Sequence, residues 1–179
     1  LIDGVRVVNL YVPNGSSLKS DKYSYKLTWL SCLERYLKAI QTRDEPLCVV
    51  GDFNIGLEAR DLPDPDRLSG GIMASDRERN ALLAALGPDL QDAFRLFEPN
   101  SGHWSWWDYR SGAWERDQGW RIDHIYLCDQ LLSCATGWIS WWLMASCLRP
   151  NGWNNAPALI WKCLRPQAFA MALKTIHVI

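Results

Sequence analysis

The fold is decided by residues 47–54, which read Leu-Cys-Val-Val-Gly-Asp-Phe-Asn. The first four are apolar, which predicts a short buried strand that runs directly into Gly51. Asp52 and Asn54 then stand two residues apart at the carboxyl end of that strand. Side chains at this spacing can point the same way, and a carboxylate beside an amide suits Mg²⁺ and the phosphate oxygens that it binds. The alternative is that the two residues only form a turn.

The sequence on either side predicts a mixed α/β arrangement. Residues 25–40 carry apolar side chains at three-to-four spacing, which is typical of an amphipathic helix. Ser75 and Glu78 form a capping box that opens a second helix, and Gly87 ends it. Asp, Pro and Gly are frequent in residues 60–71, which we expect to form a loop. Three further runs predict strands: residues 5–12, 103–109 and 121–127.

The composition is that of one globular domain. The 179 residues, of which 48% are hydrophobic and 22% charged, suffice for one core and exclude a disordered, collagenous or coiled-coil protein. The net charge of −1 means that any nucleic-acid contact depends on a local patch. The 6 cysteines form no C-x-x-C pair, so we expect reduced thiols and a cytoplasmic monomer. Residues 131–148 lack charge but contain Ser, Thr and Gly, so we expect a core strand followed by irregular chain, and no membrane contact.

The character of the chain changes after Gly137. Residues 138–179 contain no Asp or Glu, hold five of the 11 tryptophans, and show no clear strand alternation. We therefore expect residues 1–137 to form the folded domain. We interpret residues 138–179 as an aberrant Trp-rich tail, either a basic appendage or the product of a shifted reading frame.

Aromatic and basic residues gather in residues 103–110 and again in residues 119–124. Rings next to arginine can stack on sugars or bases while the cation binds phosphate. The alternative is that some rings fill the core, which applies to at least one of Trp106 and Trp107 because neighbours on a strand face opposite sides. Asp123 stands in an otherwise apolar strand, where an unpaired carboxylate is costly to bury. We expect it to orient a donor such as an imidazole, or to make a plain structural hydrogen bond.

Four segments together resemble the exonuclease III and abasic-site endonuclease family, within the endonuclease/exonuclease/phosphatase superfamily. They are residues 9–15 (Asn-Leu-Tyr-Val-Pro-Asn-Gly), 51–55 (Gly-Asp-Phe-Asn-Ile), 105–110 (Ser-Trp-Trp-Asp-Tyr-Arg) and 121–124 (Arg-Ile-Asp-His). The resemblance implies a partial four-layer α/β sandwich, with two packed β-sheets flanked by helices, and makes residues 1–137 the carboxyl-terminal portion of such a nuclease domain. It implies hydrolysis of the phosphodiester 5′ to abasic sites and removal of nucleotides from the 3′ ends of duplex DNA, with Mg²⁺ or Mn²⁺.

The resemblance also implies roles for particular residues. It assigns four to catalysis: Tyr11, Asp52, Asn54 and Asp123. It assigns six to substrate binding: Asn14, Trp106, Tyr109, Arg110, Trp120 and Ile122. Asp52 is expected to orient or deprotonate the attacking water, and Asn54 to hold the phosphate and share a metal position with Asp52. Tyr11 is expected to donate to the scissile phosphate, and Asp123 to brace a catalytic histidine. The pocket for a flipped-out sugar is expected to be walled by Trp106, Trp120 and Ile122.

Parts of the family pattern have no counterpart in these residues. They are an amino-terminal metal-binding Glu and a closing Ser-Asp-His-Ala-Pro type motif. His124 adjoins Asp123 on one strand, so we expect it to face the opposite side, and His177 has no acidic neighbour. We therefore expect a truncated or frame-disrupted member with impaired activity, the disruption lying at residues 136–138. The alternatives are a same-superfamily phosphodiesterase for RNA or phosphoinositides, a non-catalytic Trp-rich module that binds nucleic acid or sugar, and a chain that fails to fold alone.

Overall fold

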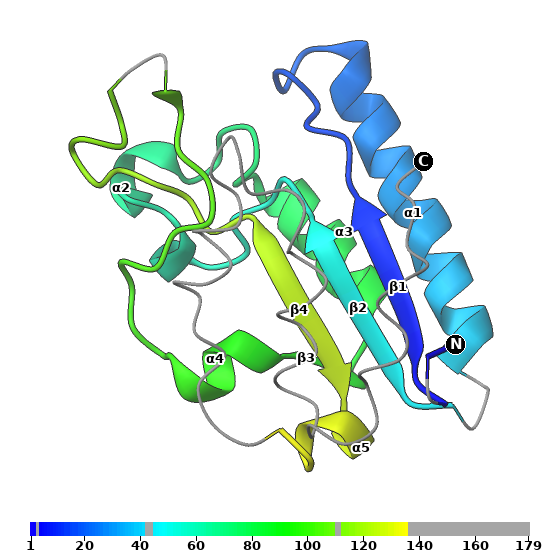
Figure 1. Cartoon of the computed structure of the whole chain (residues 1–179). Helices are drawn as coiled ribbons and strands as arrows, with labels where there is room; N and C mark the ends of the chain where they lie inside the picture. The colour runs from blue at the N-terminus through cyan, green and yellow to red at the C-terminus, as the bar shows by residue number, and fades with distance from the viewer. Residues whose placement is uncertain (3, 42–44, 110–111, 136–179) are drawn as a thin grey trace.

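A sheet of four strands forms the centre of the protein, in the order β1-β2-β4-β3 (Figure 1). The computed structural model describes residues 1–2, 4–41, 45–109 and 112–135. The strands are β1 (Arg6–Tyr11), β2 (Leu47–Asp52), β3 (Leu90–Asp92) and β4 (Asp123–Cys128). β1 and β2 run parallel, whereas β4 is antiparallel to both β2 and β3. Two sequence predictions, on Arg110 and on the tail of residues 138–179, lie outside the described residues.

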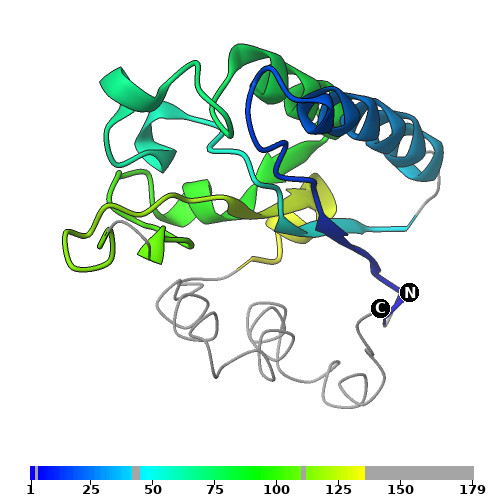
Figure 2. The ribbon, with the colours of Figure 1, turned by 90° about the horizontal axis from the view of Figure 1, so that it is seen from above.

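Two helices, α1 (Asp21–Gln41) and α3 (Asp76–Leu86), lie together on one side of the sheet (Figure 2). The side chains that α1 buries recur every three to four residues: Tyr23, Lys26, Leu30, Leu33, Leu37 and Ile40. The predicted capping box opens α3, because the Glu78 N–H donates to the Ser75 side chain and the Glu78 carboxylate accepts from the Ser75 N–H. Gly87 has φ 65° and ends the helix, as predicted.

The sheet is apolar on both faces. The face turned away from α1 and α3 carries a cluster of buried residues: Val5, Cys48, Val50, Ala93, Ile125, Leu127 and Leu131. In this cluster Ala93 comes from α4 (Ala93–Phe97) and Leu131 from α5 (Asp129–Leu132). A sheet that is apolar on both faces is the central layer of an α/β fold. The predicted mixed α/β class is confirmed, and of the two predicted sheets the described residues contain one.

The predicted strand at residues 103–109 is wrong. Instead of a strand, one isolated bridge joins Trp106 to Trp120, and regular pairing of β4 begins only at Asp123. The predicted loop at residues 60–71 begins within a 3₁₀ turn, η1 (Ala59–Asp61), and contains a short helix, α2 (Pro65–Leu68). The strand β3 and the helix α4 were not predicted, because elements of 3 and 5 residues show no periodicity.

The charge-free run that starts at residue 131 begins in α5 and not in the predicted core strand. Its residues beyond 135 lie outside the described part. Among the helices of the described ranges, none combines the length and the hydropathy that a membrane span requires. The four described cysteines are free thiols, as predicted: Cys32, Cys48, Cys128 and Cys134.

Candidate functional site

Three of the predicted catalytic residues lie side by side across neighbouring strands. Tyr11 on β1 pairs with Asp52 on β2, and Asp52 pairs in turn with Asp123 on β4. Residues paired in this way point to the same face of a sheet. The carboxyl ends of β1 and β2 and the start of β4 meet at one edge of the sheet (Figure 1). We call this set the Tyr11–Asp52–Asp123 row.

A glycine allows the strands to approach at this row. Gly51 has φ 137°, and a Cβ atom at this position would overlap the carbonyl group of Leu10 on β1. Any other residue would therefore push β1 and β2 apart directly before Tyr11 and Asp52. The Gly51 and Asp52 pair in the sequence thus joins a close strand contact to a predicted catalytic carboxylate.

Asn54 fixes the turn after β2 through three hydrogen bonds. Its backbone N–H donates to Asp52 Oδ1 at 2.8 Å, and its Nδ2 donates to the carbonyl oxygen of Val12 at 2.9 Å. Its Oδ1 accepts from Asn14 Nδ2 at 3.0 Å. Asn54 is buried and holds φ 50°, a conformation that asparagine tolerates better than most residues. The structure therefore brings Asn14 and Asn54 together, next to Asp52.

The two carboxylates of the row are held in an unfavourable electrostatic position. Burial raises the pKa of Asp123 to about 7, and the negative charge of Asp52 adds to this shift, while a hydrogen bond with Ser105 opposes it. Burial also raises the pKa of Asp52, against the opposing hydrogen bond from the Asn54 N–H. Two neighbouring carboxylates that resist ionisation are stabilised by a cation placed between them.

The donor set fits a hard divalent cation. Two carboxylates and the Asn54 amide oxygen are oxygen ligands of the kind that Mg²⁺ takes, and Mg²⁺ commonly uses only one or two carboxylates with water and substrate phosphate. In the part of the chain that the structure describes, no group of three or more His, Cys, Asp or Glu side chains could hold a metal ion.

The predicted substrate-binding residues are placed differently from one another. Trp106 and Trp120 exchange backbone hydrogen bonds at 2.9 and 2.8 Å, and both are half-buried. Ile122 is buried, and its carbonyl oxygen accepts from the Phe53 N–H at 2.9 Å, which ties this segment to the end of β2. Tyr109 is 79% exposed. The aromatic pair thus approaches the row through Ile122, whereas Tyr109 projects from the surface.

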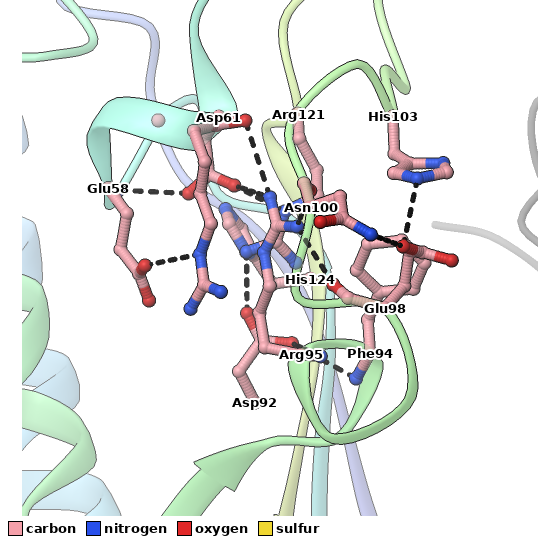
Figure 3. Close-up of polar contacts among 12 residues, drawn as sticks. Glu58, Asp61, Asp92, Phe94, Arg95, Glu98, Asn100, His103, Arg121 and His124 are labelled. Carbon is pink, nitrogen blue, oxygen red and sulfur yellow. Dashed lines mark hydrogen bonds and ion pairs between the residues drawn. The ribbon is translucent and has the colours of Figure 1, made fainter.

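A network of buried charges is centred on Arg121, between Trp120 and Ile122 (Figure 3). No sequence pattern predicted it. Arg121 donates to Asp61 Oδ1 and to Asp92 Oδ2, each at 2.6 Å, and Arg95 also pairs with Asp61. Burial alone would raise the pKa of Asp61, but the charge of Arg121 and its hydrogen bond bring that pKa below its usual value. In the sequence, Arg121 is visible as a charged residue between Trp120 and Ile122. Its burial and its partners, which are distant in sequence, become visible in the structure.

The histidines of the described residues do not contact Asp123. His124 is fully buried on the opposite face, as predicted, with Nε2 2.8 Å from the Ile55 carbonyl oxygen and Nδ1 3.7 Å from Asp92. His103 lies 3.3 Å from Glu98. Within the described ranges, Asp123 therefore bonds to Ser105, and the expected bracing of a histidine has no counterpart there.

Comparison with known proteins agrees with this geometry. The sequence model of the Endonuclease/Exonuclease/phosphatase family matches residues 1–146, so the chain belongs to that family. The chain is 32% identical over 130 residues to the exodeoxyribonuclease of Bacillus subtilis (strain 168), covering 72% of this chain and 51% of the relative. The predicted resemblance to exonuclease III and abasic-site endonucleases is thereby confirmed.

Two solved structures share the fold. The 3′ phosphatase NExo from Neisseria, bound to product DNA hairpin, superposes with a TM-score of 0.72 at 34% identity, over 75% of this chain and 52% of that one. An AP endonuclease from Archaeoglobus fulgidus gives a TM-score of 0.68 at 35% identity, over 75% and 52%. The chain spans about half the length of these relatives.

Proposed function

We propose that this chain is part of a DNA-repair phosphodiesterase that uses Mg²⁺ or Mn²⁺ and acts at abasic sites and 3′ ends of duplex DNA. The observation that carries the proposal is the Tyr11–Asp52–Asp123 row, with the two asparagines Asn14 and Asn54 beside it. The named activities of the similar proteins support the same class of reaction.

Two residues of the row, and the two asparagines beside it, have roles that their positions support. Asp52 accepts a hydrogen bond through one oxygen, from the Asn54 N–H, and we assign to it the orientation of the attacking water. Tyr11 is 67% exposed at the end of β1, and we assign its hydroxyl to donation toward the scissile phosphate. We assign Asn14 and Asn54, whose side chains bond to one another beside Asp52, to contact with the phosphate. A cation held by Asp52 and Asn54 would supply charge neutralisation at the phosphate oxygens.

The aromatic residues provide a route to DNA selectivity. Trp106 and Trp120 are joined at their backbones, and each is half-buried, so part of each ring reaches the surface. Exposed aromatic surface beside a phosphate-binding edge stacks on bases or packs against sugars. We assign this pair, with Ile122, to the wall that receives an abasic sugar, and Tyr109 to contact with the duplex.

The test is incision of a labelled duplex that contains one abasic-site analogue. We expect slow incision with Mg²⁺ or Mn²⁺, none with EDTA, and a loss of at least about 100-fold in Asp52→Ala, the range seen when a group that stabilises a transition state is removed. Asp66→Ala is the matched control, because Asp66 is an exposed carboxylate on α2. Equal incision by the wild type and Asp52→Ala, or faster cleavage of RNA than of abasic DNA, contradicts the proposal. Metal-independent, salt-sensitive binding without incision favours a binding module instead.

A further inference from the structure

A lysine and a glutamate that the proposed chemistry does not use lie fully buried beside the site. Lys26 comes from α1 and Glu78 from α3, both side chains have 0% exposure, and Nζ lies 2.6 Å from Oε1. Lys26 occupies a place in the buried stripe of α1 where the periodicity calls for an apolar residue. Lysine and glutamate are almost never fully buried unless they are paired, so this pair needs an explanation.

The ammonium group of Lys26 is bonded to both asparagines of the site. Besides Glu78, Nζ donates to the carbonyl oxygen of Asn54 at 2.8 Å and to that of Asn14 at 3.3 Å. An ammonium group has three protons, and these three acceptors use all of them. Lys26 therefore joins the loop after β1 to the loop after β2 through their backbones, while the asparagine side chains pair with one another.

Glu78 is in turn fixed by its surroundings. Its Oε1 accepts from the Met73 N–H at 3.2 Å, and its Oε2 accepts from the N–H and hydroxyl of Ser75 at 3.1 and 2.6 Å. Ser75 is also 2.7 Å from the hydroxyl of Tyr23. The glutamate is thus part of the capping box of α3 and cannot move without disturbing that helix end. It holds Lys26 in one position relative to both loops.

We propose that Lys26, held by Glu78, is a positioning residue that fixes the carbonyl groups of Asn14 and Asn54 and so holds their paired side-chain amides in place beside Asp52. The structural part of this proposal needs only the contacts above, and its consequence for catalysis rests on the proposed function. A buried ion pair is often no more stabilising than apolar residues of similar volume. Methionines at both positions keep the volume but remove the bonds to the carbonyl groups of Asn14 and Asn54, which are the contacts under test.

The test compares the double variant Lys26→Met/Glu78→Met with a matched control on the same helix. The control is Lys38→Met/Glu34→Met, which removes an exposed pair with a 2.6 Å contact. The first readout needs no activity: the side-chain amide signals of Asn14 and Asn54 in ¹H–¹⁵N spectra of the protein without metal or DNA. We expect both to shift or broaden in the buried double variant and to stay unchanged in the control.

The second readout separates kcat from KM on the abasic duplex. We expect kcat to fall by about 10- to 100-fold, because small misplacements of phosphate-binding groups have effects of this size, and KM to change less than about threefold. A folded double variant with unchanged amide signals and unchanged kcat overturns the proposal. If the wild type shows no incision, the proposed function fails, and the amide signals still decide whether Lys26 positions the asparagines.

A second variant keeps the test decisive if the double variant does not fold. Lys26→Gln retains a donor for Glu78 but has only two amide protons, so it can serve at most one of the two carbonyl groups. We expect a smaller shift of the Asn14 and Asn54 amide signals than in the double variant, and a smaller fall in kcat. Unchanged amide signals in Lys26→Gln overturn the proposal.

Discussion

Two pairs of aspartates, one within the site and one near it, differ in the charge of the groups around them. Asp61 and Asp92 share the guanidinium group of Arg121, and Asp61 also pairs with Arg95 (Figure 3). Asp52 and Asp123 face one another across β2 and β4. Burial disfavours ionisation in all four, but the pKa of the first two is nevertheless lowered, whereas that of the second two is raised.

The opposite pKa shifts distinguish carboxylates whose charge is neutralised within the fold from carboxylates whose charge is not. Arg121 and Arg95 satisfy the charge of Asp61, and His124 and Arg121 lower the pKa of Asp92, so ionisation of both aspartates stabilises the fold. Ionisation of Asp52 and Asp123 destabilises the folded protein when no cation neutralises their charge. Groups that are unfavourable for the fold in this way are candidates for function. The comparison therefore favours the second pair as the place where the proposed cation binds, with Asp52 and Asn54 as its proposed ligands.

The largest expected effect follows from removal of Arg121, the arginine that Asp61 and Asp92 share. Arg121→Met leaves two buried carboxylates without their main partner, so we expect the free energy of unfolding to fall by about 3–5 kcal/mol. Urea denaturation followed by circular dichroism measures it. Arg67→Met is the control, because Arg67 is exposed and pairs with Asp64 at the surface, where a change below about 1 kcal/mol is expected. A loss of less than about 1 kcal/mol in Arg121→Met means that the network does not support the fold.

Neutralising one arginine-paired aspartate tests the same point with less disturbance. Asp92 caps α4 by accepting from two backbone N–H groups, and asparagine caps equally well, so Asp92→Asn removes mainly the charge. We expect a loss of about 1.5–3 kcal/mol at pH 7, the range for hydrogen bonds to charged groups. Because the folded pKa of Asp92 is lowered, its contribution is complete above the unfolded pKa of about 4 and is lost as the pH falls below it. Denaturation at pH 7 and at pH 3 measures the change, and an equal loss at both contradicts the assignment.

The corresponding change in the other pair has the opposite sign. In Asp123→Asn we expect the free energy of unfolding without metal to rise by at least about 2 kcal/mol at pH 8, since each unit of pKa shift corresponds to about 1.4 kcal/mol. The folded pKa of about 7 lies above the unfolded value, so the wild type loses stability as the pH rises from about 4 to about 7. The advantage of the variant is therefore absent below this window and complete above it. A variant that is less stable than the wild type at pH 8 contradicts the comparison.

The sequence predicted the longer elements and the grouping of the row, but not these networks. Periodicity and capping reveal α1 and α3, although α1 begins at Asp21, four residues before the predicted start at Tyr25. The networks join residues 29 to 60 positions apart, and such contacts leave no local pattern. The false strand at residues 103–109 has a similar cause, because a single bridge to Trp120 takes the place of a ladder. Local sequence thus indicates which carboxylates are present, and only tertiary structure shows which of them are paired.

The smallest expected effect concerns the residue before Arg121. Trp120 is half-buried, and Trp120→Ala tests whether its ring contacts the DNA. We expect binding to abasic duplex to weaken about tenfold, equivalent to about 1.4 kcal/mol and within the range for loss of aromatic stacking. Fluorescence anisotropy measures it, with Trp114→Ala as control, because Trp114 is exposed and packs on Trp107. Equal weakening in both variants means that Trp120 has no special place at the site.

The most direct test of the account is to locate a divalent cation on the protein. Mn²⁺ broadens the NMR signals of nearby nuclei, so titration of the ¹⁵N-labelled chain with substoichiometric Mn²⁺ maps the site without any activity assay. We expect the backbone signals of Asp52, Asn54 and Asp123 to broaden first, and we expect Asp52→Ala to abolish this broadening. Broadening centred on Asp61 and Asp92, or spread evenly over the exposed acidic residues, contradicts it.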